Sequence, residues 1–357
     1  MRLTTRDLPG TGGAAKTTPE DFIVDELPAY SPSGEGSHTF VRIEKRGATT
    51  AEAVARLCRA LNVKPNEAGV AGQKDRQALT RQWISLPNIE PERALAAAVE
   101  GVRVLAAARH GNKLRTGHLA GNHFTITVRG VAADAVERAQ AIVARLVADG
   151  LPNYFGPQRF GARGDNAARG KQLLTSTTRR LPPTEKRMLV SAYQSELFNR
   201  FLDARIDDAL MSTALIGDVL KKSDTGGLFT VDATALADAQ ARLSARALVV
   251  TGPMFGHKMM APPPESPAGA REQTILAAEH IDAATFAVLG RLAEGTRRPL
   301  TVPVVSAVVR AGDAADALVL EFMLPPGAYA TVLLAEVTKV APPSATPASP
   351  TPATRDT

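Results

Sequence analysis

The chain has 357 residues, of which 44% are hydrophobic and 22% are charged, proportions that are typical of folded globular proteins and exclude wholesale disorder. Its 42 basic and 36 acidic residues give a formal net charge of +6, a mild excess that favours an anionic partner without identifying it as RNA. The single cysteine excludes an internal disulfide and any zinc site built from several thiolates.

The N-terminal residues lack the features of a targeting segment. Arg2, Arg6 and Asp7 fall within the first seven residues, without the apolar core of a signal peptide. No stretch of the sequence approaches the length of apolar residues that a membrane span needs. We therefore expect a cytoplasmic protein without a membrane partner. The sequence does not fix the oligomeric state, and we favour a monomer.

Two strands are predicted near the N-terminus. The segments 21–27 (DFIVDEL) and 38–45 (HTFVRIEK) have the composition of short strands, and residues 28–36 form a loop rich in Pro, Ser and Gly between them. This arrangement predicts a hairpin with a long connection.

A helix is predicted to follow, capped by Thr49 or Thr50. The apolar side chains within it recur at the spacing of one buried face. One of them is the single cysteine, which we expect to be a core thiol rather than a nucleophile. These positions are Val54, Leu57, Cys58 and Leu61.

Strands and helices alternate irregularly in the next part of the chain. Strands are predicted at 81–86, 102–109 and 123–129, and a helix at 132–146. Pairs that resemble hairpins occur beside crossovers, and this order favours an α+β body over a doubly wound parallel sheet.

The length and the later pattern predict two domains. Residues 151–301 are predicted to be mostly helical, with helices near 186–206, 232–245 and 282–296. The strand predicted at 317–324 and the helix predicted at 328–339 would return the chain to the first body. We therefore expect a domain formed by 1–150 plus 302–340, a domain inserted at 151–301, and a proline-rich, disordered tail at 341–357.

The segment 71–83 (AGQKDRQALTRQW) carries the clearest chemical signal. In it Asp75 lies between Lys74 and Arg76, after a glycine turn and before a strand. Two cations beside a carboxylate would keep it ionised and ready to act as a nucleophile or base. The same triplet is also common in solvated turns, and by itself it does not decide between the two roles.

Two further segments combine aromatic and polar residues. Residues 151–161 (LPNYFGPQRFG) place three aromatic side chains beside Gln158 and Arg159, an arrangement that suits base stacking or an ordinary core turn. Residues 191–200 (SAYQSELFNR) have the spacing of an amphipathic helix, from which Asn199 could reach a functional site.

Basic residues are concentrated in two regions, 103–118 and 159–187. The second holds eight Lys or Arg residues against Asp165 and Glu185 and could form a surface that follows RNA phosphates. A solvated helix face would have the same composition.

Together, AGQKD, GNHF, NYFGPQRFG and SAYQSELFN resemble the TruD family of tRNA pseudouridine synthases. They occur in the family's order, and PEDFIVDE and LPPGAYAT extend the resemblance from Thr11 to about Val337. It implies a pseudouridine synthase catalytic domain with a mixed, largely antiparallel sheet, interrupted by a family-specific insertion domain. It also implies isomerisation of uridine 13 of tRNA, without a metal or organic cofactor.

The resemblance places the catalytic aspartate at Asp75 and the uridine contacts at Phe22, Asn122 and Tyr329. At Tyr329 the family often has phenylalanine; tyrosine keeps the ring but adds a hydroxyl that needs a partner. In SAYQSELFN the Tyr-Gln pair also varies in the family. Phe124 is a further stacking candidate, although its side chain could equally point into the sheet.

A uracil must leave the RNA stack before its glycosidic bond can be reached. Asp75 could then attack C6 of the base, attack C1′ of the ribose, or remove a ribose proton, and the sequence does not choose among these routes. Each route needs an ionised carboxylate, for which Lys16, Lys74 and Arg76 are the candidate cationic partners. The alternatives are a noncatalytic tRNA-binding or chaperone protein and, with less support, a metal-dependent nuclease.

Overall fold

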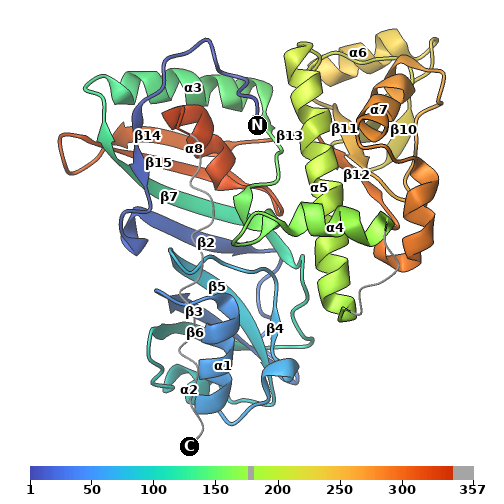
Figure 1. Cartoon of the computed structure of the whole chain (residues 1–357). Helices are drawn as coiled ribbons and strands as arrows, with labels where there is room; N and C mark the ends of the chain where they lie inside the picture. The colour runs from blue at the N-terminus through green and yellow to red at the C-terminus, as the bar shows by residue number, and fades with distance from the viewer. Residues whose placement is uncertain (176–180, 341–357) are drawn as a thin grey trace, which may run out of the picture.

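The structure is a computed structural model that describes residues 1–175 and 181–340. A large sheet carrying helices forms one body, and a second group of helices and strands stands beside it (Figure 1). The predicted tail, 341–357, lies outside the described residues, as do Arg179 and Arg180 of the second basic region.

The main sheet is mixed and largely antiparallel. Its strands are β1 (Gly12–Ala15), β2 (Phe22–Pro28), β3 (His38–Lys45), β4 (Gly69–Val70), β5 (Leu79–Pro87), β6 (Val102–His110), β7 (Leu119–Val131), β14 (Val305–Ala311) and β15 (Ala317–Leu324). Seven of them run in the order β14-β15-β7-β2-β5-β3-β6, while β1 pairs with β7 and β4 with β5. Within the described residues, β2 and β5 form the one parallel pair of this sheet.

The predicted hairpin between 21–27 and 38–45 is wrong, although both segments are strands. β5 lies between them: it pairs in parallel with Ile23–Asp25 of β2 and antiparallel with the whole of β3. Alternating apolar residues indicate a half-buried strand but do not show which strand pairs with it. The long connection between β2 and β3 leaves room for β5, which comes later in the chain, to pair with both.

Helix α1 (Thr50–Ala60) packs on the half of the sheet made by β3, β5 and β6, with α2 (Pro91–Leu95) beside it. Thr49 caps α1 by accepting a hydrogen bond from the Glu52 N–H, and the Glu52 carboxylate accepts one from Thr49 in return. The predicted face of α1 is buried, Cys58 included. Burial raises the pKa of the Cys58 thiol, as expected of a core cysteine.

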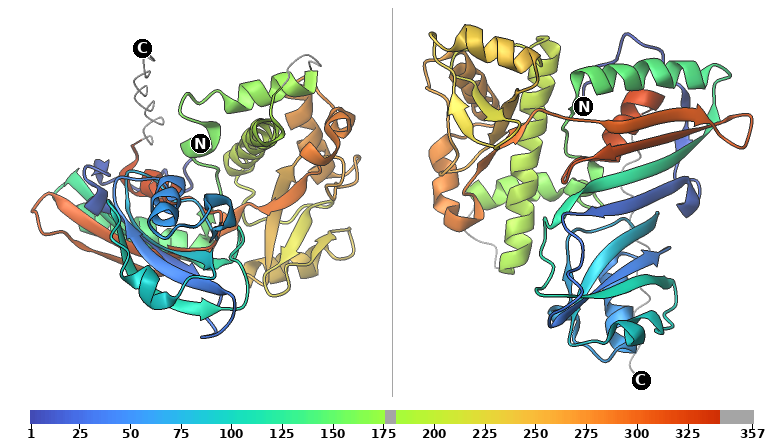
Figure 2. Two further views of the ribbon diagram at one scale, coloured as in Figure 1. Left: turned by 90° about the horizontal axis from the view of Figure 1, so that it is seen from below. Right: turned by 180° about the vertical axis from the view of Figure 1, so that it is seen from behind.

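Helices α3 (Ala135–Asp149) and α8 (Ala330–Thr338) pack on the other half of the sheet. They lie on the same face as α1 (Figure 2), which we call the inner face. Side chains of β2, β7 and β15 meet α8 there in one large core, which includes Phe22, Phe124, Phe322, Leu333 and Val337.

The second group of elements contains both helices and strands. The helices are α4 (Asn166–Thr175), α5 (Pro183–Asp207), α6 (Leu236–Ser244) and α7 (Pro267–Ala278), and the strands are β9 (Val219–Lys222), β10 (Leu228–Thr230), β11 (Leu248–Met254) and β12 (Thr296–Pro299). Two of the predicted helices correspond to α5 and α6, and the third to a 3-10 helix. The sheet β10-β9-β11-β12 was not predicted. The 3-10 helices of the chain are η1 (Pro19–Asp21), η2 (Pro65–Glu67), η3 (Pro157–Phe160) and η4 (Ala283–Leu292).

The chain leaves the first body and returns to it through two adjacent short strands. These are β8 (Leu151–Pro152) and β13 (Thr301–Val302), in which Leu151 lies opposite Val302. We therefore propose that 151–301 is an inserted unit in a catalytic domain formed by 1–150 plus 302–340. The two units share one core, because side chains of α5 join the cluster that contains Leu151.

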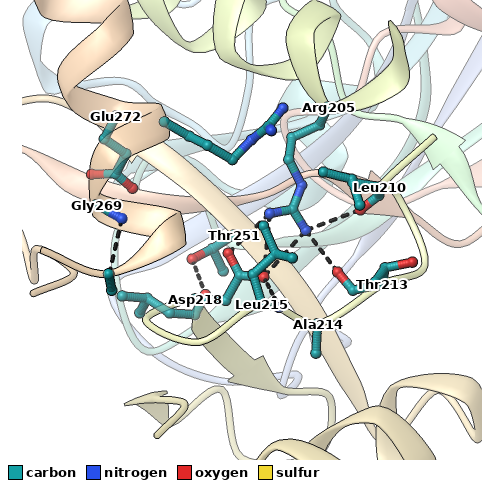
Figure 3. A network of polar contacts seen from close by, with 12 residues as sticks. Arg205, Leu210, Thr213, Ala214, Leu215, Asp218, Thr251, Gly269 and Glu272 are labelled. Carbon is teal, nitrogen blue, oxygen red and sulfur yellow. Dashed lines mark hydrogen bonds and ion pairs between the residues drawn. The ribbon is translucent and has the colours of Figure 1, made fainter. Parts of the chain in front are cut away.

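Two ion pairs are buried inside the inserted unit. The Arg205 guanidinium has no exposed side-chain surface and donates to both carboxylate oxygens of Asp218 at 3.0 and 3.2 Å (Figure 3). It also donates to the carbonyl oxygens of Leu210 and Thr213. Nearby, Arg297 pairs with Glu272 at 2.6 Å. These contacts hold α5, α7 and the small sheet in one arrangement.

Candidate active site

Asp75 lies in the loop between β4 and β5, on the N-terminal side of β5. Its carboxylate oxygen Oδ2 accepts hydrogen bonds from two side chains distant in sequence, Lys16 Nζ and Gln158 Nε2, both at 2.6 Å. The other oxygen, Oδ1, accepts from the Gln77 N–H at 3.3 Å and thereby closes a turn within the loop. The Asp75 side chain is 24% exposed and the Lys16 side chain 18%.

The surroundings favour the ionised form of Asp75. Burial alone would raise the pKa of this carboxyl, but the adjacent Lys16 ammonium and the hydrogen bonds from Lys16 and from the loop N–H groups outweigh it, so the pKa lies below its usual value of 3.8. A carboxylate that stays charged while partly withdrawn from water is what a nucleophile or base at this position requires.

Lys16 directly follows β1 and has a backbone φ of 65°, in the left-handed region that non-glycine residues rarely adopt. Its ammonium lies 4.4 Å from the centre of the Phe22 ring, within the range of a cation–π contact. The strained backbone therefore accompanies a side chain that touches both Asp75 and Phe22, and such outliers are common at functional sites.

A second lysine holds the main chain of the Asp75 loop. Lys45 is buried, and its Nζ donates to the main-chain carbonyls of Ala48 and Asp75 at 2.6 and 2.7 Å. Burial lowers the pKa of Lys45 to about 8, against the opposing effect of Asp75. The Lys74 N–H also donates to Thr50 Oγ1 at 2.8 Å, which ties the loop to the start of α1.

The two cations that flank Asp75 in sequence have other partners. Lys74 Nζ contacts Asn122 Oδ1 at 2.7 Å and the Glu26 carboxylate at 2.8 Å. The Arg76 guanidinium pairs with Glu52. Of the three candidates, Lys16 is therefore the one whose side chain contacts the Asp75 carboxylate in the described residues. Lys74 instead orients Asn122, which lies opposite Glu26 in the β2–β7 pair.

Phe22 and Phe124 face the inner side of the sheet. Both rings are buried, at 5% and 6% exposure, and meet edge to face at a centroid distance of 6.2 Å. Phe124 also stacks on Phe322 at 5.3 Å. The structure therefore gives Phe124 the packing role that the sequence left open, whereas the Phe22 ring packs in the same core and also contacts the Lys16 ammonium.

Tyr329 lies late in the chain and is the residue that precedes the first turn of α8. Its ring meets Phe155 edge to face at 6.2 Å and packs on Gly156, where an added Cβ would lie 2.9 Å from Tyr329 Cδ1. Burial raises the pKa of the Tyr329 hydroxyl. The Arg298 guanidinium stacks 4.0 Å from the Phe155 centroid and donates to the Gly327 carbonyl, so it links the 153–161 segment to the LPPGAYAT turn.

Two residues of the 151–161 and 191–200 motifs have roles that the sequence did not specify. Gln158 reaches Asp75, a contact that no local pattern indicates because 83 positions separate the two residues. Asn199, considered as a site residue, instead clamps the main chain of Phe155, accepting from its N–H at 2.9 Å and donating to its carbonyl at 3.0 Å.

Residues 1–175 and 181–340 contain no group of three or more His, Cys, Asp or Glu side chains arranged to hold a metal ion. None of the helices in these ranges combines the length and the apolar character needed to cross a membrane.

Comparison with known proteins identifies the family. The model of the family described as tRNA pseudouridine synthase D (TruD) matches residues 1–180 and 174–337. The chain belongs to the TruD family.

Similar TruD proteins span almost the whole chain. The tRNA pseudouridine synthase D of Anaeromyxobacter dehalogenans is 49% identical over 347 residues, covering 95% of this chain and 96% of the relative. That of Thermus thermophilus is 44% identical over 337 residues, covering 94% and 91%. The expectation drawn from the four motifs is thus confirmed at the level of the family.

The TruD fold is confirmed by a solved structure. The crystal structure of a Methanosarcina mazei protein assigned to TruD matches 95% of this chain and 96% of its own, with a TM-score of 0.75 and 24% identity. At this identity the match concerns the fold alone. It agrees with the expected α+β architecture around a mixed, largely antiparallel sheet.

Proposed function

We propose that this protein is a tRNA pseudouridine synthase, an isomerase that converts uridine 13 of tRNA to pseudouridine with Asp75 as its essential carboxylate. The observation that carries the proposal is the Asp75 carboxylate, partly buried and kept ionised by Lys16 at 2.6 Å. Membership of the TruD family supplies the class of reaction and the tRNA substrate.

The reaction is an isomerisation and needs no second substrate. The bond between ribose C1′ and uracil N1 breaks, a bond between C1′ and C5 forms, C5 loses a proton and N1 gains one. Asp75 begins this sequence by attack on C6, by attack on C1′ or by removal of a ribose proton. All three routes start from a charged carboxylate, which the lowered pKa of Asp75 supplies at neutral pH.

The target uridine must be held outside the RNA stack while the base turns. We assign the stacking surfaces to Phe22 and Tyr329. The Phe22 ring contacts Lys16, which binds Asp75, and the Tyr329 ring packs on Gly156, two residues before Gln158. Asn122 is assigned to the uracil edge. Its Oδ1 accepts from Lys74, which leaves its amide nitrogen to donate to a uracil carbonyl.

The tRNA backbone is assigned to the side where the inserted unit meets the catalytic domain. A cavity of about 720 Å³ there is lined by Phe155, Phe160, Arg163 and Arg200. Arg163 is exposed, whereas Arg169 and Lys171 of the same basic region pair with Glu185 and Glu279. The part of the basic region that remains for phosphates is therefore smaller than its sequence indicates.

The proposal is tested by incubating the purified protein with a tRNA transcript and mapping pseudouridine at each position. A transcript with cytidine in place of uridine 13 is the control. Pseudouridine at position 13 of the first transcript, and at no position of the second, is the expected result. Modification elsewhere would refute the choice of position, and binding without conversion would favour a noncatalytic tRNA-binding protein.

A further inference from the structure

Gln158 is an exposed side chain that makes one short contact, its Nε2 donating to Asp75 Oδ2 at 2.6 Å. It belongs to η3, in the segment through which the chain passes from the catalytic domain into the inserted unit. An exposed glutamine gains little stability from one hydrogen bond, since its side-chain entropy opposes ordering. The contact therefore calls for a reason other than folding.

The segment that carries Gln158 is held by the inserted unit. The Arg159 guanidinium donates to Ser195 Oγ at 3.0 Å and to Ser191 Oγ on α5. Asn199, one turn further along α5, clamps the main chain of Phe155. The position of Gln158 is consequently tied to the position of α5 through these four hydrogen bonds.

Lys16 and Gln158 bind the same carboxylate oxygen. With Oδ2 engaged by an ammonium and an amide, rotation of the carboxylate about its Cβ–Cγ bond is restricted. Both side-chain donors are thus on Oδ2, whereas Oδ1 accepts from the Gln77 N–H of its own loop at 3.3 Å, a long hydrogen bond. Since no side chain of the described residues donates to Oδ1, this is the oxygen left to meet a substrate.

We propose that Gln158 is a positioning residue for Asp75: it fixes Oδ2 so that Oδ1 faces the uridine, and it makes this alignment depend on the docking of the inserted unit. The proposal rests on the proposed pseudouridine synthase activity. It assigns separate tasks to the two donors. Lys16 supplies the charge that keeps Asp75 ionised, whereas the neutral amide of Gln158 supplies direction.

The test compares Gln158→Ala with Gln273→Ala, an exposed glutamine on α7 whose amide contacts the Pro264 carbonyl. Single-turnover conversion is measured with enzyme in excess, together with the Kd for tRNA and the melting temperature. Gln158→Ala should slow conversion about 10- to 100-fold, because misplacement of a reacting group by about 1 Å has effects of this size. Its Kd should change less than about threefold, which separates alignment from binding. Gln273→Ala should match the wild type.

A Gln158→Glu variant adds a second measurement, the pH dependence of the conversion rate, which should not change if Gln158 only stabilises the fold. A carboxylate beside Asp75 disfavours ionisation of the pair, so the acid limb of the rate profile should shift to higher pH. In Gln158→Ala the limb should shift less, because alanine adds no negative charge beside Asp75.

Conversion by Gln158→Ala at the wild-type rate would overturn the proposal. So would a loss confined to tRNA affinity, or an unshifted profile for Gln158→Glu. These outcomes leave the pseudouridine synthase assignment intact, whereas wild-type protein that converts no uridine overturns both.

Discussion

The charge on Asp75 depends on a side chain that lies 59 positions earlier in the chain. Lys16 opposes the effect of burial, and the carboxyl titrates below 3.8 in the folded protein. A depressed pKa contributes stability above the ordinary pKa, and this contribution is lost as the pH falls through the lowered value. Asp75 is thus fully ionised throughout the neutral range, where the reaction has to proceed.

Replacing Lys16 by Met tests this dependence. Burial then acts unopposed by the ammonium, so the pKa of Asp75 should rise and the acid limb of single-turnover conversion should move to higher pH. Lys16→Arg keeps the positive charge and should retain a profile closer to that of the wild type. The rates are measured between about pH 4.5 and 8. The wild-type rate should show no acid limb from Asp75 in this range, and the same result for Lys16→Met would show that Lys16 does not control the ionisation of Asp75.

At the residue scale, the sequence singled out Asp75 as the candidate carboxylate but did not decide among its possible partners. Adjacent side chains in an extended loop point in different directions, so Lys74 turns to Glu26 and Arg76 to Glu52. The contacts of Asp75 with Lys16 and Gln158 come from elements that meet only in the folded chain. Lys16 was one of three candidate cations, whereas nothing local pointed to the contact of Gln158 with Asp75.

At the scale of elements, the patterns predicted six of the nine described strands of the main sheet, missed β1, β4 and β14, and predicted the pairing of strands poorly. Residues 38–45 form β3 as predicted, yet β5 and not β2 is its neighbour. In the inserted unit, β9 and β10 have four and three residues, too few to show alternation. β11 contains Gly252 and Pro253, residues that argue against a strand when only the sequence is known.

The inserted unit also depends on a buried charge pair that the sequence does not reveal. Asp218→Asn would leave the Arg205 guanidinium buried without its anionic partner, at a cost of about 3–5 kcal/mol in the free energy of unfolding. Asp238→Asn is the matched control, because Asp238 pairs with Arg242 on the exposed surface of α6 and such pairs contribute about 0–1 kcal/mol. Urea unfolding followed by circular dichroism measures both. Equal losses in the two variants would contradict the account of the buried pair.

At the scale of the whole molecule, the proposed active site draws residues from both proposed units. The catalytic domain supplies Asp75, Lys16, Phe22, Asn122 and Tyr329, while the segment entering the inserted unit supplies Gln158. The proposed division into two units is the one expected from the sequence, where the pattern of the main sheet resumes after residue 301. The way they meet could not be predicted, because α5 shares its core with the catalytic domain through contacts distant in sequence.

The assigned tRNA surface predicts a specific dependence on salt. Arg163 is exposed beside the cavity between the units. Its replacement by Gln should reduce the slope of log K against log salt by about one unit, the effect of one lost phosphate contact. Arg310→Gln, on the edge strand β14 and paired with Glu321, should leave the slope unchanged. Equal slopes for Arg163→Gln and the wild type would place the RNA on another surface.

The most direct test of the central claim is pseudouridine formation by Asp75→Asn, which keeps the size of the side chain and removes its charge. The variant should bind tRNA with nearly wild-type affinity, and Asp238→Asn should convert uridine normally. Conversion at position 13 by Asp75→Asn should fall by about three orders of magnitude or more, since positioning alone does not replace a lost nucleophile or base. Near-normal conversion by Asp75→Asn would contradict the assignment of Asp75 as the essential carboxylate.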